Sequence, residues 1–272
     1  MYYFALPALF FVNIGNTQFN QKILKYVFAA VIPLAAAIII YILLYSLFKF
    51  AKSTLYLLIL STAFGSTAFF GIPFITFAFP GSKGESLAVL SAAAISIVGV
   101  SISITALELY KLEKSSIIQG IKKVAERFSR NPLILSILFG VVYSVAGVKL
   151  PSFAVKALYM VGRTTSTIAI FMLGLFLYGK NYKNIKTALS LSLLRIIFLP
   201  ALAFILFYFL FYLPDIQRMI LILMHSMPVA ISMMVLSERY DFFKQTIASL
   251  LLISSVGSVL YLSVWLIILG VG

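Results

Sequence analysis

Two long apolar segments of this chain are each interrupted near the middle by residues that break helices. Residues 55–79 (LYLLILSTAFGSTAFFGIPFITFAF) contain Gly65 and Pro73, and residues 216–239 contain Pro228. Proline removes a backbone donor and clashes with the preceding turn, so each segment is expected to unwind near its centre. An unpaired backbone group costs several kcal/mol in lipid, so unwound chain at membrane depth must be surrounded by protein or water.

The composition places the chain in the membrane. Hydrophobic residues make up 62% of it and charged residues 10%, against about 25% charged in a soluble domain. We therefore expect an all-α polytopic membrane protein. The chain starts in apolar sequence without a basic leader region, so no cleavable signal peptide is expected.

Several function classes are excluded by residue types that the chain lacks. There is no Cys and one His, which excludes a disulfide framework, a thiolate metal site, a cysteine nucleophile and a His-rich metal cluster. The net charge of +14 is explained by basic residues in short loops beside membrane spans. We therefore expect no cofactor and no nucleic-acid partner.

About nine membrane spans are predicted, each needing roughly 20 apolar residues. They cover residues 2–14, 24–48, 55–79, 86–109, 132–148, 153–178, 185–210, 216–236 and 243–269. The polar stretch 110–131 carries apolar residues at helical spacing, among them Ile117, Ile121 and Phe128. That pattern predicts an amphipathic helix at the cytoplasmic surface.

The basic residues predict the orientation of these spans. One set of loops carries roughly twice as many Lys and Arg residues as the other, so the richer side is expected to be cytoplasmic. The richer set is Lys49, Lys52, Lys111, Lys114, Lys122, Lys123, Arg127, Arg130, Lys180, Lys183, Lys186, Arg239 and Lys244; the poorer set is Lys22, Lys25, Lys83, Lys149, Lys156 and Arg218.

The two halves of the chain show the same order of features. Each interrupted segment is followed by a span rich in small residues, SAAAISIVGV at 91–100 and LLISSVGSVL at 251–260. Matching spans have opposite orientations in a nine-span arrangement, which predicts an inverted repeat. Interrupted segments at corresponding places in two halves indicate the substrate site of a transporter.

Short motifs along the chain resemble one family. GSTAFFGIP at 65–73 resembles the N-T-x-x-x-G-[IL]-P signature of the auxin efflux carrier family, which includes plant PIN carriers and bacterial malate-type permeases. Further fragments match the family in the same order: FALPALFF at 4–11, ALEL at 106–109, NPLILSILFGVV at 131–142, TIAIFMLGLFL at 167–177, RIIFLP at 195–200 and MPVAI at 227–231.

This resemblance implies an inverted-repeat transporter with two broken crossover helices, bile-acid symporter/NhaA-like in fold. The first repeat would be residues 1–109, with a scaffold span at 2–14 and transport spans at 24–109. After the loop 110–131, the second repeat would be residues 132–272, with scaffold spans at 132–178 and transport spans at 185–269. The family has ten spans, and the first is expected to be missing here.

The candidate substrate site lies at the two interruptions. The N-termini of half-helices carry free N–H groups and a partial positive charge, which bind carboxylates. Where the family has Asn at the first crossing this chain has Ser66, so selectivity is expected to differ. Alternatively, these residues only kink their helices. The candidate residues are Gly65, Ser66, Thr67, Pro73, Ser226, Pro228 and Arg195.

Four charged or titratable side chains lie in or beside predicted spans, and two of them, Arg195 and His225, have two interpretations each. Arg195 lies inside a span, where a cation costs about 2.5–3.5 kcal/mol; it is either a functional cation beside an anion path or a partner for carbonyls freed at a broken helix. Arg163 is expected to snorkel outward. His225 either carries protons or fills a hydrogen-bonding gap, and Glu108 is expected to form a solvated ion pair with Lys111.

The function expected from these features is transport rather than catalysis. No catalytic dyad, metal cluster or phosphate loop is present, and no carboxylate lies deep in a predicted span. The leading hypothesis is a secondary transporter of a small organic anion, a carboxylate, working by alternating access in the cell membrane, with a homodimer as one expected assembly. The alternatives are a sodium-coupled organic-anion symporter of the related bile-acid carrier fold and a non-transporting membrane sensor or subunit.

Overall fold

The computed structural model describes the whole chain except residues 1–2, 112–128, 130–131, 148–149, 180 and 272, so most of the predicted helix at 110–131 lies outside the described residues. The described part is helical and contains no β-strand. Its first half contains α1 (Ala5–Gly15), α2 (Gln21–Ala29), α3 (Ile32–Phe48), α4 (Lys52–Ala63), the π-helical turn η1 (Thr67–Gly71), α5 (Ile72–Ala78) and α6 (Ser82–Lys111). Its second half contains α8 (Pro132–Val145), α9 (Ser152–Leu177), α10 (Ile185–Leu193), η2 (Leu194–Phe198), α11 (Leu199–Ile205), η3 (Leu206–Leu210), α12 (Asp215–His225), α13 (Ser232–Tyr240) and α14 (Lys244–Ile268).

Four of the described helices are long and apolar enough to cross a membrane: Gln21–Phe48, Ser82–Lys111, Ile185–Leu210 and Lys244–Ile268. Shorter apolar helices cover Ala5–Gly15, Thr67–Ala78 and Pro132–Val145. The all-α membrane class is therefore shown, whereas nine spans and an inverted repeat stay predictions.

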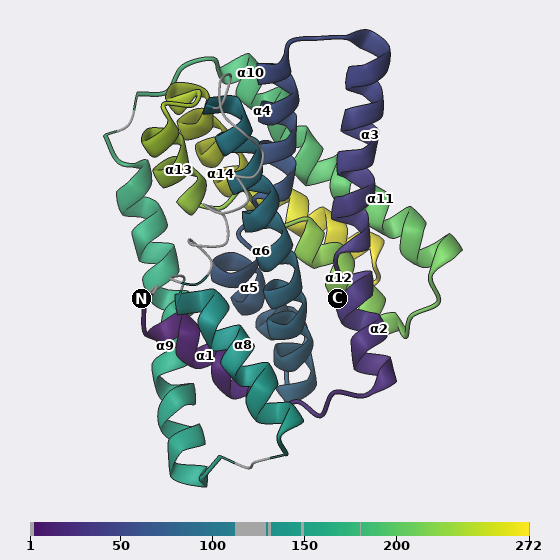
Figure 1. The fold of residues 1–272 in the computed structure, drawn as a ribbon, viewed down its shortest axis with the longest axis vertical. Coiled ribbons are helices and arrows are strands. Elements are labelled where there is room, and N and C mark those ends of the chain that lie inside the picture. The colour runs from purple at the N-terminus through teal and green to yellow at the C-terminus, as the bar shows by residue number, and fades with distance from the viewer. Residues whose placement is uncertain (1–2, 112–128, 130–131, 148–149, 180, 272) are drawn as a thin grey trace.

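Helices α1, α8 and α9 form a group at the lower left of Figure 1, with α1 in contact with both others. Glycines allow the close approach, because a Cβ built on Gly140 would lie 3.1 Å from Ile14 Cβ and one on Gly162 would lie 3.0 Å from Leu9 Cβ. These helices fall in the segments assigned to the scaffold. We call α1, α8 and α9 the scaffold group; that it stays fixed while the rest moves is a prediction.

Two further units share one order of elements: a helix, a non-helical break, a second helix and a long helix. In the first unit α4 and α5 flank the break and α6 follows; in the second, α12 and α13 flank the break and α14 follows. Figure 1 shows α6 running alongside α4 and α5 through the length of the molecule. Gly99 of α6 lies directly against the end of α4, because a Cβ there would be 2.6 Å from Ala63 O.

The ends of α6, α13 and α14 meet in the upper part of Figure 1. There, Tyr240 at the end of α13 donates a 2.5 Å hydrogen bond to Glu108 Oε1 of α6, and Asn184 Nδ2 donates to Thr246 Oγ1 of α14 at 3.0 Å. The chain segments predicted to share the cytoplasmic side therefore lie together. The prediction of a solvated Glu108 was wrong: its exposed fraction is 4%, and its carboxylate accepts the Tyr240 hydroxyl.

Candidate functional site

The first interrupted segment unwinds at residues 64–66. Helix α4 ends at Ala63, and Phe64 (φ −95°, ψ 71°) and Ser66 (φ −78°, ψ 48°) are both outside the helical region. The helix resumes in the wide turn η1, where the N–H groups of Phe70 and Gly71 both donate to Ser66 O at 3.0 Å.

Pro73 is not at this break, contrary to the reasoning that made it a cause of the unwinding. It occupies the first turn of α5, after η1. The helix is continuous from Thr67 to Ala78, so Pro73 removes one backbone hydrogen bond inside it, next to the wide turn η1, and not at a free helix N-terminus. The break is instead centred on Gly65.

The second interrupted segment unwinds between His225, the last residue of α12, and Ser232, the first of α13. Pro228 lies inside this break, as its helix-breaking chemistry predicts. The hydroxyl of Ser226 donates to Ile222 O of its own helix at 2.9 Å. Ser226 is therefore at the site, but its hydroxyl proton is already donated within its own helix.

The two breaks pair with each other, and we call residues 64–66 together with 226–231 the crossing. Gly65 and Val229 form an isolated antiparallel β-bridge. The Ser66 N–H donates to Pro228 O at 2.7 Å, and the Ala230 N–H donates to Phe64 O at 2.8 Å. Backbone groups that each helix leaves free are thus satisfied by the other, as a membrane interior requires.

Arg195 links both sides of the crossing from η2. Its side chain is completely buried; Nε donates to Met227 O at 2.8 Å and Nη1 donates to Thr62 O at 2.5 Å. Of the two sequence interpretations, a partner for carbonyls at the broken helices accounts for these two nitrogens. The third, Nη2, has no hydrogen-bond partner among the described residues.

Gly65 is required at the crossing by this guanidinium. A Cβ built on Gly65 would overlap the Nη2 and Cζ atoms of Arg195. Neither group can easily move away, because Arg195 is held at two nitrogens and Gly65 is held in the β-bridge. The glycine therefore lets the cation lie against the backbone of the first break.

The polar side chains beside the first break differ in whether they already have a hydrogen-bond partner. Thr67 Oγ1 is 3.0 Å from Ser96 Oγ of α6, so this hydroxyl ties η1 to α6. The Ser66 hydroxyl does not cap the following helix and makes no hydrogen bond with another described residue. The N-terminus of α13 also lacks a side-chain cap. Two uncapped helix N-termini thus face the crossing.

His225 bridges the second break to another kink. Its Nε2 lies 3.0 Å from Ala30 O, where α2 gives way to α3, and its Nδ1 has no partner among the described residues. A neutral imidazole protonated on Nε2 fits this contact, so the interpretation as a side chain that fills a hydrogen-bonding gap describes what His225 does here.

Sequence reasoning missed the residues that support Arg195 and the first break. Tyr41 OH is 2.8 Å from Thr62 Oγ1, and Trp265 Nε1 donates to Ile196 O at 2.9 Å, in the π-helical turn that carries Arg195. Both are aromatic residues in apolar segments, and only their polar atoms could have signalled a partner.

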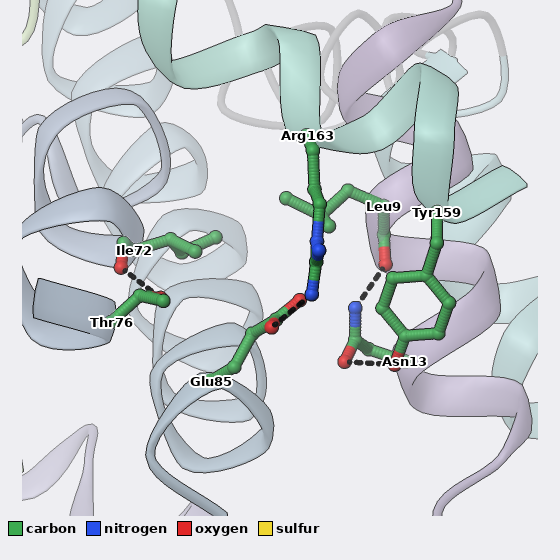
Figure 2. A network of polar contacts seen from close by, with 7 residues as sticks. All are labelled: Leu9, Asn13, Ile72, Thr76, Glu85, Tyr159 and Arg163. Carbon is green, nitrogen blue, oxygen red and sulfur yellow. Dashed lines mark hydrogen bonds and ion pairs between the residues drawn. The ribbon is translucent and has the colours of Figure 1, made fainter. Parts of the chain in front are cut away.

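A second polar cluster joins the scaffold group to α6 (Figure 2). Arg163 Nη2 of α9 lies 3.9 Å from Glu85 Oε2 of α6. Beside it, Tyr159 OH donates to Asn13 Oδ1 at 3.1 Å, and Asn13 Nδ2 donates to Leu9 O at 2.9 Å. Figure 2 shows Arg163 pointing toward Glu85, and its side chain is 74% exposed; the outward snorkelling expected from the sequence stays a prediction.

Within the described residues, no group of three or more His, Cys, Asp or Glu side chains is placed to hold a metal ion. The candidate residues Gly65, Ser66, Pro228 and Arg195 are brought together at the crossing, with Thr67 and Ser226 at its edges and Pro73 away from it.

Comparison with known proteins supports the resemblance seen in the motifs. A family model described as "Membrane transport protein" matches residues 1–266. An uncharacterized transporter of Methanocaldococcus jannaschii is 29% identical over 275 residues, which cover 97% of this chain and 85% of that protein.

Proposed function

The chain belongs to the family of membrane transport proteins that contains the auxin efflux carriers, and from this premise we propose that it is a secondary transporter of a small organic anion whose carboxylate binds at the crossing. The membrane would be the cell membrane, spanned several times. This proposal of a substrate class and a binding site rests on the family and on the helical membrane architecture.

The observation that carries the proposal is a buried positive charge at the crossing. Arg195 is fully buried, and none of the described carboxylates is paired with it. A buried charge without a counter-ion is strongly unfavourable. An anion at the crossing would offset that cost, and the uncapped N-termini of η1 and α13 would add partial positive charge.

The groups at the crossing would contribute to anion binding in two ways, by direct hydrogen bonds and by charge. The Ser66 hydroxyl and the first N–H groups of η1 would donate directly to the carboxylate, as helix N-termini do for anions. The Nη2 atom of Arg195 is out of contact with solvent in this conformation, so it would act through its charge. Arg195 would also hold the breaks together by its bonds to Thr62 O and Met227 O.

The movement would be alternating access. Substrate sites of such transporters lie between discontinuous helices, and one bundle rocks against another around them. Here the two interrupted units with α2, α3, α10 and α11 would form the mobile core, and the scaffold group would be the fixed partner.

Sodium-coupled symport is not favoured by the crossing. Carbonyl oxygens are the ligands such a site would need, yet Thr62 O and Met227 O accept from Arg195. Phe64 O and Pro228 O accept from the opposite break. Each of these oxygens already accepts one N–H donor, and the guanidinium charge of Arg195 beside them would repel a sodium ion.

The test is uptake into proteoliposomes that contain the purified protein. Radiolabelled acetate, L-malate and indole-3-acetate would be supplied separately with and without a sodium gradient. We expect saturable, sodium-independent uptake of at least one of them, compared with liposomes lacking protein. Absence of uptake and binding for all three would contradict the proposal, and strict sodium dependence would favour the symporter.

A further inference from the structure

The guanidinium of Arg163 is held loosely in the middle of a scaffold helix. The side chain is 74% exposed, and its ion pair with Glu85 spans 3.9 Å, at the outer limit for such a contact. Eleven residues of α9 precede Arg163, which at 1.5 Å per residue places it roughly 16 Å along the helix. If residues 153–178 form the predicted span, a cation at this position would cost several kcal/mol unless it faced water or a counter-ion.

The ion pair of Arg163 joins two different parts of the molecule, α9 of the scaffold group and α6. Figure 2 shows the side chain extending from α9 toward α6, not away from the bundle. The large exposed fraction means that protein atoms do not fill the space around the guanidinium. The guanidinium is therefore exposed where α9 of the scaffold group faces α6 of the mobile core.

Glu85 can leave this pair without becoming isolated. It lies in the first turn of α6, where the helix N-terminus stabilises a carboxylate. Its side chain is 13% exposed, so it is the more enclosed partner. If the pair opened, Glu85 would keep that favourable environment. Arg163 would then have free donors for another carboxylate.

The neighbouring polar pair forms a fixed wall. Asn13 is buried, and its side chain both accepts from Tyr159 and donates to Leu9 O. Tyr159 is one helical turn before Arg163 on α9, so this bond anchors α9 to α1 at the level of the cation. Arg163 is thus presented from a rigid surface, as a selecting residue needs.

We propose that Arg163 is a specificity-determining residue on the path of the transported anion, and that Glu85 occupies it in this conformation until a substrate carboxylate takes its place. This inference rests on the proposed function, because it assumes that the cargo carries a carboxylate. Arginine suits the role because its planar fork of donors binds carboxylates in a bidentate manner. The exchange of one carboxylate for another would make entry selective for anions.

The inference predicts effects of opposite sign for the two partners. With Arg163→Gln, the concentration for half-maximal uptake should rise about 10- to 100-fold, because a charged hydrogen-bonding partner is lost. With Glu85→Gln, it should fall about 2- to 5-fold, because a loosely paired competitor is removed. Arg163→Lys should lie between wild type and Arg163→Gln.

The experiment measures initial uptake rates in proteoliposomes with whichever of acetate, L-malate and indole-3-acetate the wild type transports. Lys156→Gln is the matched control, because Lys156 is an exposed cation on the same helix; it should leave the half-saturating concentration unchanged. In the Arg163→Gln background, Glu85→Gln should have no further effect, because Glu85 competes with the substrate only for Arg163.

The outcomes distinguish a failure of the role inferred for Arg163 from a failure of the proposed transport function. If the wild type transports a carboxylate but Glu85→Gln and Arg163→Gln both weaken transport alike, the pair is a structural contact and only this inference is overturned. The same holds if Arg163→Gln matches Lys156→Gln. If the wild type neither binds nor transports any of the three carboxylates, the proposed function fails and the inference fails with it.

Discussion

The amide of Ser66 donates a 2.7 Å hydrogen bond to the carbonyl of Pro228, so the two interrupted helices are joined backbone to backbone where each one unwinds. This bond, with its counterpart from Ala230 to Phe64, satisfies backbone groups that the unwound chain would otherwise bury without partners. It also fixes the N-termini of two half-helices around one point, beside the guanidinium of Arg195.

Adding a methyl group at Gly65 should damage the crossing. Gly65→Ala would place its Cβ on the Arg195 guanidinium, and overpacking of this kind costs about 1–3 kcal/mol. We expect a lower midpoint of thermal unfolding in detergent and little remaining transport. Gly257→Ala is the control, because a Cβ there would meet Tyr261 at an ordinary 3.9 Å. Equal stability of the two variants would show that the crossing can absorb the methyl group.

Removing the Ser66 hydroxyl should weaken substrate binding without unfolding the protein. Ser66→Ala deletes a donor that makes no hydrogen bond with a described residue, so the fold loses little, while a bound carboxylate would lose about 1–3 kcal/mol. Isothermal titration with the transported carboxylate measures the change. The control is Ser263→Ala, an exposed serine on α14 that donates to Val259 O of its own helix. Unchanged affinity in Ser66→Ala would place the carboxylate elsewhere.

The hydroxyl of Ser226 should matter less than that of Ser66. Its proton is donated to Ile222 O within α12, so it is not available to an anion. We expect Ser226→Ala to change affinity by no more than about 2-fold, well under the effect of a lost charged hydrogen bond. The same titration tests this, and a loss equal to that of Ser66→Ala would mean that Ser226 turns toward the substrate.

The basic residues predict the orientation of the protein. Single cysteines at Ala51, in the loop between α3 and α4, and at Ser82, at the start of α6, are both exposed, and the chain has no native Cys. An impermeant thiol reagent should label Ser82→Cys in intact cells and leave Ala51→Cys unlabelled until the cells are opened. The reverse pattern would invert the assigned topology.

Sequence reasoning reached the crossing because its signals are local. Gly65 and Pro228 act on their own backbone, so each break could be placed from the residues inside it. Pro73 was placed at the break for the same reason, but its position in the first turn of α5 depends on where the preceding π-helical turn ends. No pattern of residue types shows that point.

The partners of buried charges could not be predicted in the same way. Arg195 is held by the carbonyls of Thr62 and Met227, and carbonyls are present at every residue, so they leave no mark in the sequence. Glu108 accepts the hydroxyl of Tyr240, 132 positions away, and Arg163 meets Glu85 across two helices. Burial of a carboxylate is decided by packing, which a charge count does not contain.

The most direct test of the account is an experimental structure of the protein with its transported carboxylate bound. We predict the carboxylate at the crossing, with an oxygen within hydrogen-bond distance of the Ser66 hydroxyl or the first N–H groups of η1, and Arg195 still bonded to the carbonyls of Thr62 and Met227. A carboxylate bound away from the crossing, with the Gly65–Val229 bridge unchanged, would contradict the account and leave the two breaks as structural kinks.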